Sequence, residues 1–401
     1  MTPIQIGIMG IVVLAILLAV RAPAGISLVI AAALGGSLLT SPGLALAELG
    51  GNILRIVSHY DLSVVPLLIL TCLAWANPGS RAAGCRPYIL LSNDQQPPAK
   101  TGISSSDDQQ PPAKTGISRA AGCRPYILLP VVFAFLAGIS TGRFLMAGVI
   151  PGIIVAVLLI LTVIILKLFA PRRLPDPLKS LFSFRLKTHL YFLIIPVVAI
   201  IIVAGIFFGL VTPTEAFAVG AFISLLFMAV SRRLTRKGLV EISRSSVVET
   251  VRVFVLITGG RVFGVFLTRS LFHVTLTQFS AGAGIPPFLV LGFILFLYTV
   301  MGFVFDGLAA LVIVTPFAYP IITGLGYSGN WFGILAILAL MPGTLARGRA
   351  AALPADNDAV RSVREVVLAR WPFWTAMLAA CMIVAAIPET VTLLPRLTLG
   401  M

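Results

Sequence analysis

Residues 286–325 read PPFLVLGFILFLYTVMGFVFDGLAALVIVTPFAYPIITGL, and this stretch decides the fold class. It holds two long apolar runs, 286–305 and 308–325, and its only charged residue is Asp306, which lies between them. A helix that crosses the bilayer core needs about 20 mainly apolar residues, so each run predicts a membrane helix. The strands of a membrane barrel would instead alternate polar and apolar residues over about ten positions.

The composition of the whole chain agrees with this stretch. The chain has 401 residues, of which 58% are hydrophobic and 11% charged, and its mean hydropathy is +1.05. A soluble domain is about 45–50% apolar and about 25% charged, so these values exclude that class. The net charge is +15. Because most basic residues flank apolar runs, they are typical of cytoplasmic loops, and we expect no nucleic-acid partner.

Similar apolar segments recur along the chain and predict an all-α, polytopic membrane protein with roughly 10–12 membrane segments. Some contain proline, at positions 66, 151, 316 and 320. Such segments mark either re-entrant or broken helices near a transport site, or kinks stabilised by neighbouring helices. The candidate spans are 4–20, 25–46, 63–76, 125–140, 144–168, 189–210, 215–231, 251–273, 286–305, 308–325, 330–343 and 372–394.

Charge places the loops relative to the membrane. The basic stretches 171–187 and 232–244 predict cytoplasmic loops, as does 347–370. Two crossings fit between the first two loops, and the connection 274–285 carries no charged residue, which predicts the outer side.

A nested repeat interrupts the apolar pattern. RAAGCRPYILL stands at 81–91 and again at 119–129, and DQQPPAKTGIS stands at 94–104 and again at 108–118. The inner unit is too polar to pack a core, so we expect disorder there. The chain therefore divides into N-terminal membrane helices (1–76), a polar insert (77–129) and the remaining membrane transport domain (130–401). The identity of the copies favours a recent duplication or an assembly artefact over a functional motif.

Residues 209–220, GLVTPTEAFAVG, predict the start of a helix. Thr212 is the expected cap, Pro213 falls in the first turn, and Glu215 lies near the positive end of the helix dipole. The stretch resembles the G-x-x-TPTEA-x-AVG signature of the large, DctM-like permease subunit of tripartite ATP-independent periplasmic (TRAP) transporters. Further stretches that resemble this family are 4–45, 66–70, 144–156, 301–320, 331–333 and 365–396.

The resemblance implies a fold of two inverted halves, in which one part moves across the membrane against a fixed scaffold. It also implies a secondary importer of small carboxylates, of the C4-dicarboxylate type, in the bacterial inner membrane, with sodium as the coupling ion. The implied partners are a small membrane subunit and a periplasmic substrate-binding protein, with membrane lipid around the helices. We expect no cofactor and no enzyme activity, because the sequence lacks a Ser-His-Asp order, HExxH or a phosphate-binding loop.

Asp306 and Gly307 are the candidate ion-binding residues. An ionisable group at membrane depth is costly and is a functional candidate by default. A carboxylate beside unwound backbone suits sodium, and the resemblance places this aspartate by a sodium site; the alternative is a simple helix cap. The candidate residues of the transport pathway are Thr212, Pro213, Thr214, Glu215, Thr315, Pro316 and Arg261. The partner expected for Arg261 is lipid phosphate, Asp306 or an anionic substrate.

The sequence departs from the family at two hairpins, which the resemblance implies supply most substrate and sodium contacts. The nested repeats replace a Gly/Ser-rich hairpin in the first half. In the second half, the expected T-P-P-x-G reads LMPGTLARGR at 340–349. Two alternatives therefore stay open: a degenerate, non-transporting remnant of such a permease, and a membrane scaffold or assembly subunit without a solute pathway.

Overall fold

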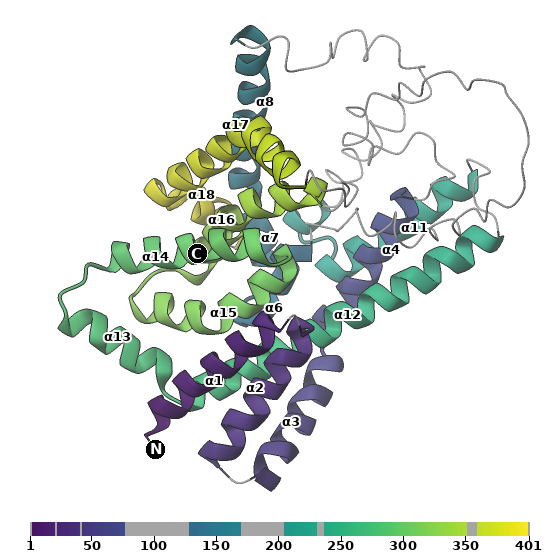
Figure 1. Ribbon diagram of the computed structural model, residues 1–401. Helices are drawn as coiled ribbons and strands as arrows, with labels where there is room; N and C mark the ends of the chain where they lie inside the picture. The colour runs from purple at the N-terminus through teal and green to yellow at the C-terminus, as the bar shows by residue number, and fades with distance from the viewer. Residues whose placement is uncertain are drawn as a thin grey trace, which may run out of the picture.

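The computed structural model describes residues 2–20, 22–40, 42–76, 128–169, 204–230, 236–350 and 359–399. Within these ranges every regular element is a helix, which confirms the all-α class (Figure 1). The expected disorder of the insert, the basic loop 171–187 and most of the span 189–210 lie outside the described residues. The helices are α1 (Pro3–Ala19), α2 (Ala24–Leu39), α3 (Pro42–Val57), η1 (Tyr60–Ser63), α4 (Val64–Ala76), α6 (Leu128–Ala137), α7 (Thr141–Ala147), α8 (Val149–Phe169), α11 (Pro213–Val230), α12 (Arg236–Arg269), α13 (Phe272–Gly282), α14 (Pro287–Val304), α15 (Gly307–Gly324), α16 (Gly329–Ala350), α17 (Ala359–Ala386) and α18 (Glu389–Leu399).

Five helical segments in the described ranges are long and apolar enough to cross a membrane. A sixth is added if α17 and α18, which meet at a bend of 65°, count as one broken span. Shorter apolar helices, α1, α2, α4, α6 and α16, accompany them. These segments confirm a multi-pass helical membrane protein; the total of 10–12 segments and the two inverted halves stay predictions. The five are Thr141–Leu166, Pro213–Val230, Gly238–Arg269, Pro287–Val304 and Gly307–Gly324.

The helices differ from the predicted segments in three places, while the side of the membrane predicted for each connection stays a prediction. The basic stretch from residue 236 to 244 is not a loop but the first turns of α12, where Arg236 and Arg244 stay exposed on the helix surface. Most of the connection 274–285 is the helix α13. The predicted span 25–46 is too long, because α2 ends at Leu39 and residues 42–57 form the separate amphipathic helix α3. The loop signals failed because charge and polarity mark contact with water, which a helix surface provides as well as a loop does.

The prolines do not break the helices in which they lie. Pro66 and Pro151 fall in the first turns of α4 and α8, where a missing N–H costs no helical hydrogen bond. Pro316 and Pro320 lie inside α15, which continues past both. The breaks occur elsewhere, and one separates α14 from α15 at Asp306. This pattern favours the kink interpretation of the prolines over broken helices.

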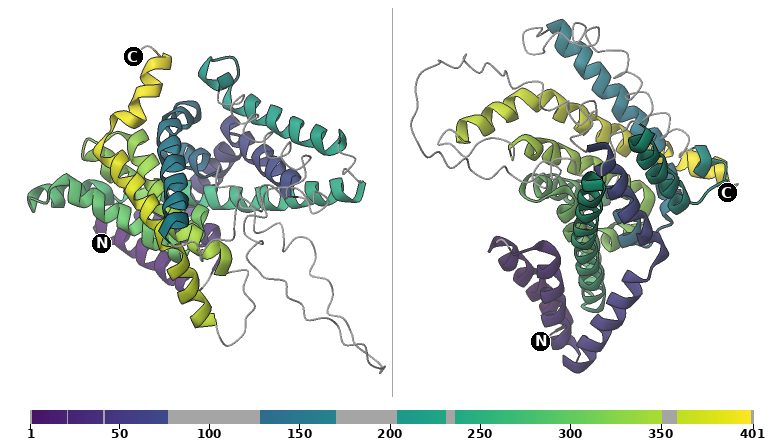
Figure 2. Two further views of the ribbon diagram at one scale, coloured as in Figure 1. Left: turned by 90° about the horizontal axis from the view of Figure 1, so that it is seen from above. Right: turned by 90° about the vertical axis from the view of Figure 1, so that its right-hand side faces the viewer.

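Helix α12 connects the N-terminal helices to the rest of the molecule (Figures 1 and 2). Its 34 residues extend for about 50 Å, and the half with lower numbers runs beyond α1 and α2 alongside α4, which in turn packs against α11. In its other half, the Phe266 ring packs against Gly10 of α1 and Gly35 of α2. Gly259 meets the backbone of Gly25 so closely that neither helix has room for a larger residue there.

Candidate functional site

The connection between α14 and α15 is the first part of the candidate site. α14 ends at Val304, Phe305 is extended, and Asp306 takes the N-cap position of α15, where its carbonyl accepts the Ala310 N–H at 2.8 Å. The Asp306 side chain makes no capping hydrogen bond to α15. The backbone of Asp306 therefore occupies the N-cap position, but its carboxylate does not cap the helix.

Helix α16 packs against this connection. A methyl group added to Gly307 would lie 2.7 Å from Cγ2 of Thr344, so α15 begins in close contact with α16. One turn earlier on α14, the backbones of Gly302 and Gly343 touch. The part of α16 that faces Gly302 and Gly307 is therefore the LMPGT stretch, at the place where the family resemblance calls for T-P-P-x-G.

α16 is a continuous helix through this stretch, with Pro342 inside it. A proline disturbs the hydrogen bonds of the turn before it. The Thr299 hydroxyl of α14 lies 2.8 Å from the Ala339 carbonyl of that turn and 3.0 Å from the Leu295 carbonyl of its own helix, so its one hydrogen is shared between the two acceptors. The described structure thus has a proline-containing helix at the position expected for the second hairpin.

Thr315 and Pro316 lie in the middle of α15, and Thr315 is buried. The Thr315 hydroxyl donates to the Leu311 carbonyl at 2.7 Å and is 3.0 Å from the hydroxyl of Tyr298, which is buried in α14. Pro316 packs against α12 at Gly264. In this structure the Thr315 hydroxyl is engaged in contacts within α15 and between α14 and α15.

Arg261 of α12 reaches the end of α6. Its Nη1 donates to the Leu136 carbonyl at 3.2 Å, and its guanidinium lies 5.3 Å from the centre of the Phe135 ring. α6 ends there because Gly138 adopts a positive φ of 69°, and Ile139 N–H bonds back to the Ala134 carbonyl at 2.9 Å. A cation beside the last carbonyls of a helix is favoured by the helix dipole. The contacts of Arg261 are therefore with the end of α6, which it stabilises, and not with Asp306.

The TPTEA stretch forms the helix start that its sequence predicts. Thr212 N–H donates to Glu215 Oε2 at 2.8 Å, and Glu215 N–H points to the Thr212 hydroxyl at 3.4 Å, as in a capping box. Gly209, with φ of 67°, closes the preceding helical turn, which explains the glycine at the head of the motif. The buried Thr214 donates to the Tyr60 hydroxyl at 2.9 Å. Sequence reasoning missed Tyr60, because a contact across 154 positions leaves no local signal.

The structure brings the predicted residues together in two groups. Asp306, Gly307, Thr315 and Pro316 share α15, and Arg261 lies on α12, which packs along α15 through its glycines. The TPTEA start belongs to a different set of contacts, with η1 and with α7, whose Gly142 faces the Pro213 ring. Among the residues that the structure describes, no group of three or more His, Cys, Asp or Glu side chains is placed to hold a metal ion.

Comparisons with known proteins agree with these motifs. The family described as "Tripartite ATP-independent periplasmic transporter, DctM component" matches residues 115–390. The sialic acid TRAP transporter large permease protein SiaM of Vibrio cholerae is 31% identical over 274 residues, which are 67% of this chain and 63% of that protein.

The names of two further relatives give different substrates. The C4-dicarboxylate TRAP transporter large permease protein DctM of Rhodobacter capsulatus is 26% identical over 65% of this chain and 59% of its own length. The isethionate TRAP transporter permease protein DctMQ of Oleidesulfovibrio alaskensis is 27% identical over 64% of this chain and 41% of its own length. The aligned regions thus span less than two thirds of these relatives. All three are transporter permeases and not enzymes, and the chain belongs to the DctM-component family of TRAP transporters.

Proposed function

We propose that this chain is the membrane permease subunit of a secondary importer that takes up a small carboxylate together with sodium, in the bacterial inner membrane. Membership of the DctM family supports the transporter class. The observation that carries the coupling proposal is the position of Asp306, at a helix break between two candidate spans and next to Gly307, which packs against the proline-containing α16. Broken helices of transporters present unwound carbonyls to sodium ions, and an intramembrane carboxylate supplies the compensating charge.

Oxygen atoms near the break suit a small hard cation. The Leu340 carbonyl faces Gly302 at the crossing of α14 with α16, and Thr344, whose methyl group faces Gly307, carries its hydroxyl on the same side chain. The Thr344 hydroxyl donates to the Met341 carbonyl at 2.8 Å, so its oxygen keeps lone pairs for a cation. Asp306, Gly307 and Thr344 are therefore the residues that we assign to the sodium site.

The substrate class rests on the names of the relatives. Those names give sialic acid and C4-dicarboxylate, which carry carboxyl groups, and isethionate, which carries a sulfonate group. Arg261 is half-buried on α12 next to α15 and uses one N–H for the Leu136 carbonyl. A guanidinium has five N–H donors, so others remain to bind a carboxylate. A small membrane subunit and a periplasmic binding protein that delivers the substrate complete the proposed system.

A second candidate function is a non-transporting remnant of such a permease. The observation that favours it is α16, which runs as one helix to Ala350 through the place of the T-P-P-x-G hairpin. In that case the breaks and caps would persist as packing features only. A scaffold or assembly subunit without a solute pathway would behave alike in an uptake assay.

Uptake of labelled carboxylates by vesicles that contain the chain and its two partner proteins tests the proposal. We expect Asp306→Asn to raise the sodium concentration needed for half-maximal uptake about tenfold or more, because an amide lacks the charge that binds the cation. Asparagine also favours the N-cap position, so α15 should still form. Glu389→Gln, at the exposed start of α18, is the matched control and should leave uptake unchanged. Unaltered sodium dependence in Asp306→Asn would remove that residue from the proposal.

A further inference from the structure

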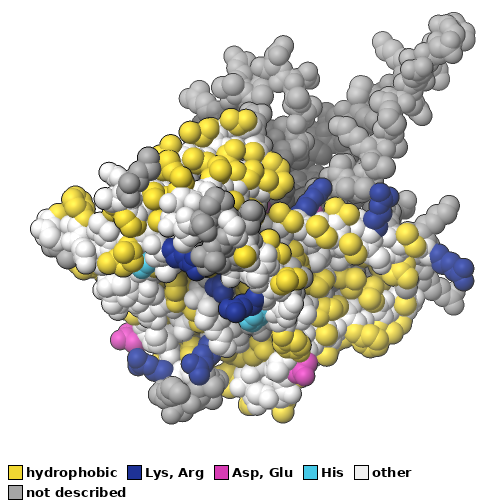
Figure 3. Space-filling view, turned by 90° about the horizontal axis from the view of Figure 1, so that it is seen from below, with side chains coloured by type: hydrophobic (Ala, Val, Ile, Leu, Met, Phe, Trp, Pro, Cys, Tyr) yellow, Lys and Arg dark blue, Asp and Glu magenta, His cyan; other side chains and the backbone are white. Residues whose placement is uncertain are grey.

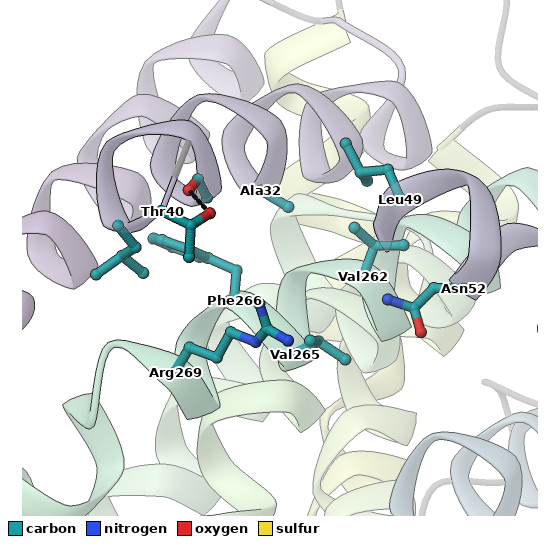
Figure 4. A pocket seen from close by; sticks show the side chains of 10 residues that line it. Ala32, Thr40, Leu49, Asn52, Val262, Val265, Phe266 and Arg269 are labelled. Atoms are coloured by element: carbon teal, nitrogen blue, oxygen red, sulfur yellow. Dashed lines mark hydrogen bonds between the residues drawn. The ribbon is translucent and has the colours of Figure 1, made fainter. Parts of the chain in front are cut away.

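A groove runs between α2, α3 and the end of α12 (Figure 4). Its cavity volume is about 40 Å³, and the empty space rises to about 400 Å³ only when the part open to the surroundings is included. Figure 4 shows Arg269 extending into it from α12 and Asn52 pointing into it from α3. Its lining residues are Ala32, Gly36, Leu39, Thr40, Leu49, Asn52, Val262, Val265, Phe266 and Arg269.

The groove is lined by both apolar and polar side chains. Leu39, Leu49, Val262 and Phe266 supply hydrocarbon surface from all three helices. The polar side chains are those of Thr40, Asn52 and Arg269, and Arg269 is the last residue of α12. A long side chain at the end of a membrane helix places its charge at the depth of the lipid headgroups. The groove thus combines hydrocarbon depth with a cation at the membrane surface.

The surface beside the groove belongs to the membrane. Leu34 and Leu38 of α2 are each 52% exposed, and Leu54 of α3 is 71% exposed. In a protein with several apolar spans, acyl chains cover such side chains. Figure 3, seen from below, shows hydrophobic side chains over much of this side of the molecule with basic side chains set among them. An acyl chain can therefore enter the groove directly from the bilayer.

We propose that the groove binds one anionic phospholipid, with an acyl chain along the apolar wall and the phosphodiester at Arg269 and Asn52. A guanidinium presents several N–H donors in a plane that matches two phosphate oxygens, and the asparagine amide adds two donors. Basic side chains near a membrane surface attract anionic headgroups electrostatically. Charge complementarity and the open side of the groove therefore agree on the same ligand. The inference concerns lipid binding and does not depend on the proposed transport.

Photolabelling of the purified full chain tests the site. The probe is phosphatidylglycerol with a diazirine in one acyl chain, and the labelled peptides are identified by mass spectrometry. We expect labels in residues 32–40, 49–52 and 262–269, and about tenfold or more weaker labelling in Arg269→Gln, because that change removes a charge-assisted hydrogen bond. Arg269→Lys should retain most of the labelling. Arg244→Gln, exposed on the same helix outside the groove, is the matched control and should label like the original chain.

Other outcomes would overturn the proposal. Equal labelling by a diazirine diacylglycerol, which lacks the phosphate, would show that the groove does not recognise the phosphate and contacts lipid non-specifically. Competition by free glycerophosphoglycerol as strong as that by the whole lipid would remove the role of the acyl chain. Loss of labelling when the small membrane subunit binds would assign the groove to that protein. Val265→Trp keeps the charge but fills the groove, and undiminished labelling of this variant would also contradict the assignment.

Discussion

The buried hydrogen bond between Tyr298 and Thr315 provides a prediction whose sign follows from the geometry. Tyr298 is 0% exposed and its hydroxyl is 3.0 Å from that of Thr315. Thr315 has one hydroxyl hydrogen, which it donates to the Leu311 carbonyl at 2.7 Å. Tyr298 must therefore donate to Thr315, and the two single substitutions leave different groups behind.

Tyr298→Phe removes the donor, and the Thr315 hydroxyl still bonds the Leu311 carbonyl. This variant should therefore lose only about 1 kcal/mol of unfolding free energy. Thr315→Val removes the acceptor and leaves the Tyr298 O–H buried without a partner, which should cost about 1–3 kcal/mol. The double variant has neither hydroxyl. It should therefore be more stable than Thr315→Val alone, at about the level of Tyr298→Phe.

Unfolding in mixed detergent micelles, followed by the fluorescence of the four tryptophans, measures these free energies in a double-mutant cycle. Thr323→Val is the control, because its hydroxyl bonds carbonyls of its own helix α15 and it is exposed, so little change is expected. A double variant that loses the full sum of the two single effects would refute the hydrogen bond between the two side chains.

The remaining predictions concern caps and helix contacts. Thr212→Ala should lower the unfolding free energy by about 1 kcal/mol, since it removes the cap of α11, and the same micelle unfolding checks it. Gly343→Ala should lower the unfolding free energy by about 1–3 kcal/mol, because its methyl group would meet the α14 backbone. Gly292→Ala, which has open space around it, is the control and should not lower the unfolding free energy. Equal losses in the two variants would contradict the close crossing of α14 and α16. Arg261→Gln should lower the stability of the α6 end by about 1–2 kcal/mol, because the hydrogen bond to Leu136 is lost, and Arg261→Lys should lower it less. The rate of proteolysis in the α6–α7 connection measures this local opening. A cleavage rate unchanged in Arg261→Gln would contradict this role.

Local sequence signals predicted the helices and their caps well. The apolar runs on either side of Asp306 are α14 and α15, and TPTEA is a capping box at the first turn of α11. Both signals act within a few residues, where hydrophobic burial and backbone hydrogen bonding are decided by the local sequence. Charge was a weaker guide, because the basic residues at the start of α12 lie on a helix.

The contacts of the candidate site could not be predicted in the same way. The Thr214–Tyr60 bond and the Arg261 bond to Leu136 join segments 154 and 125 positions apart. The pattern of one helix does not say which neighbour it meets. Likewise, LMPGT predicts a helix with a proline, but not that this part of α16 packs on Gly302 and Gly307. These contacts depend on how the helices cross, which a single sequence leaves open.

Uptake driven by an imposed sodium gradient is the most direct test of the central claim. Vesicles would contain this chain with its small membrane subunit, supplied outside with a carboxylate-loaded binding protein. The account predicts accumulation of labelled carboxylate that needs an inward sodium gradient and stops when an ionophore dissipates it. Absence of uptake with all three proteins present, across the acids named for its relatives, would contradict the proposal and identify the chain as a non-transporting member of its family.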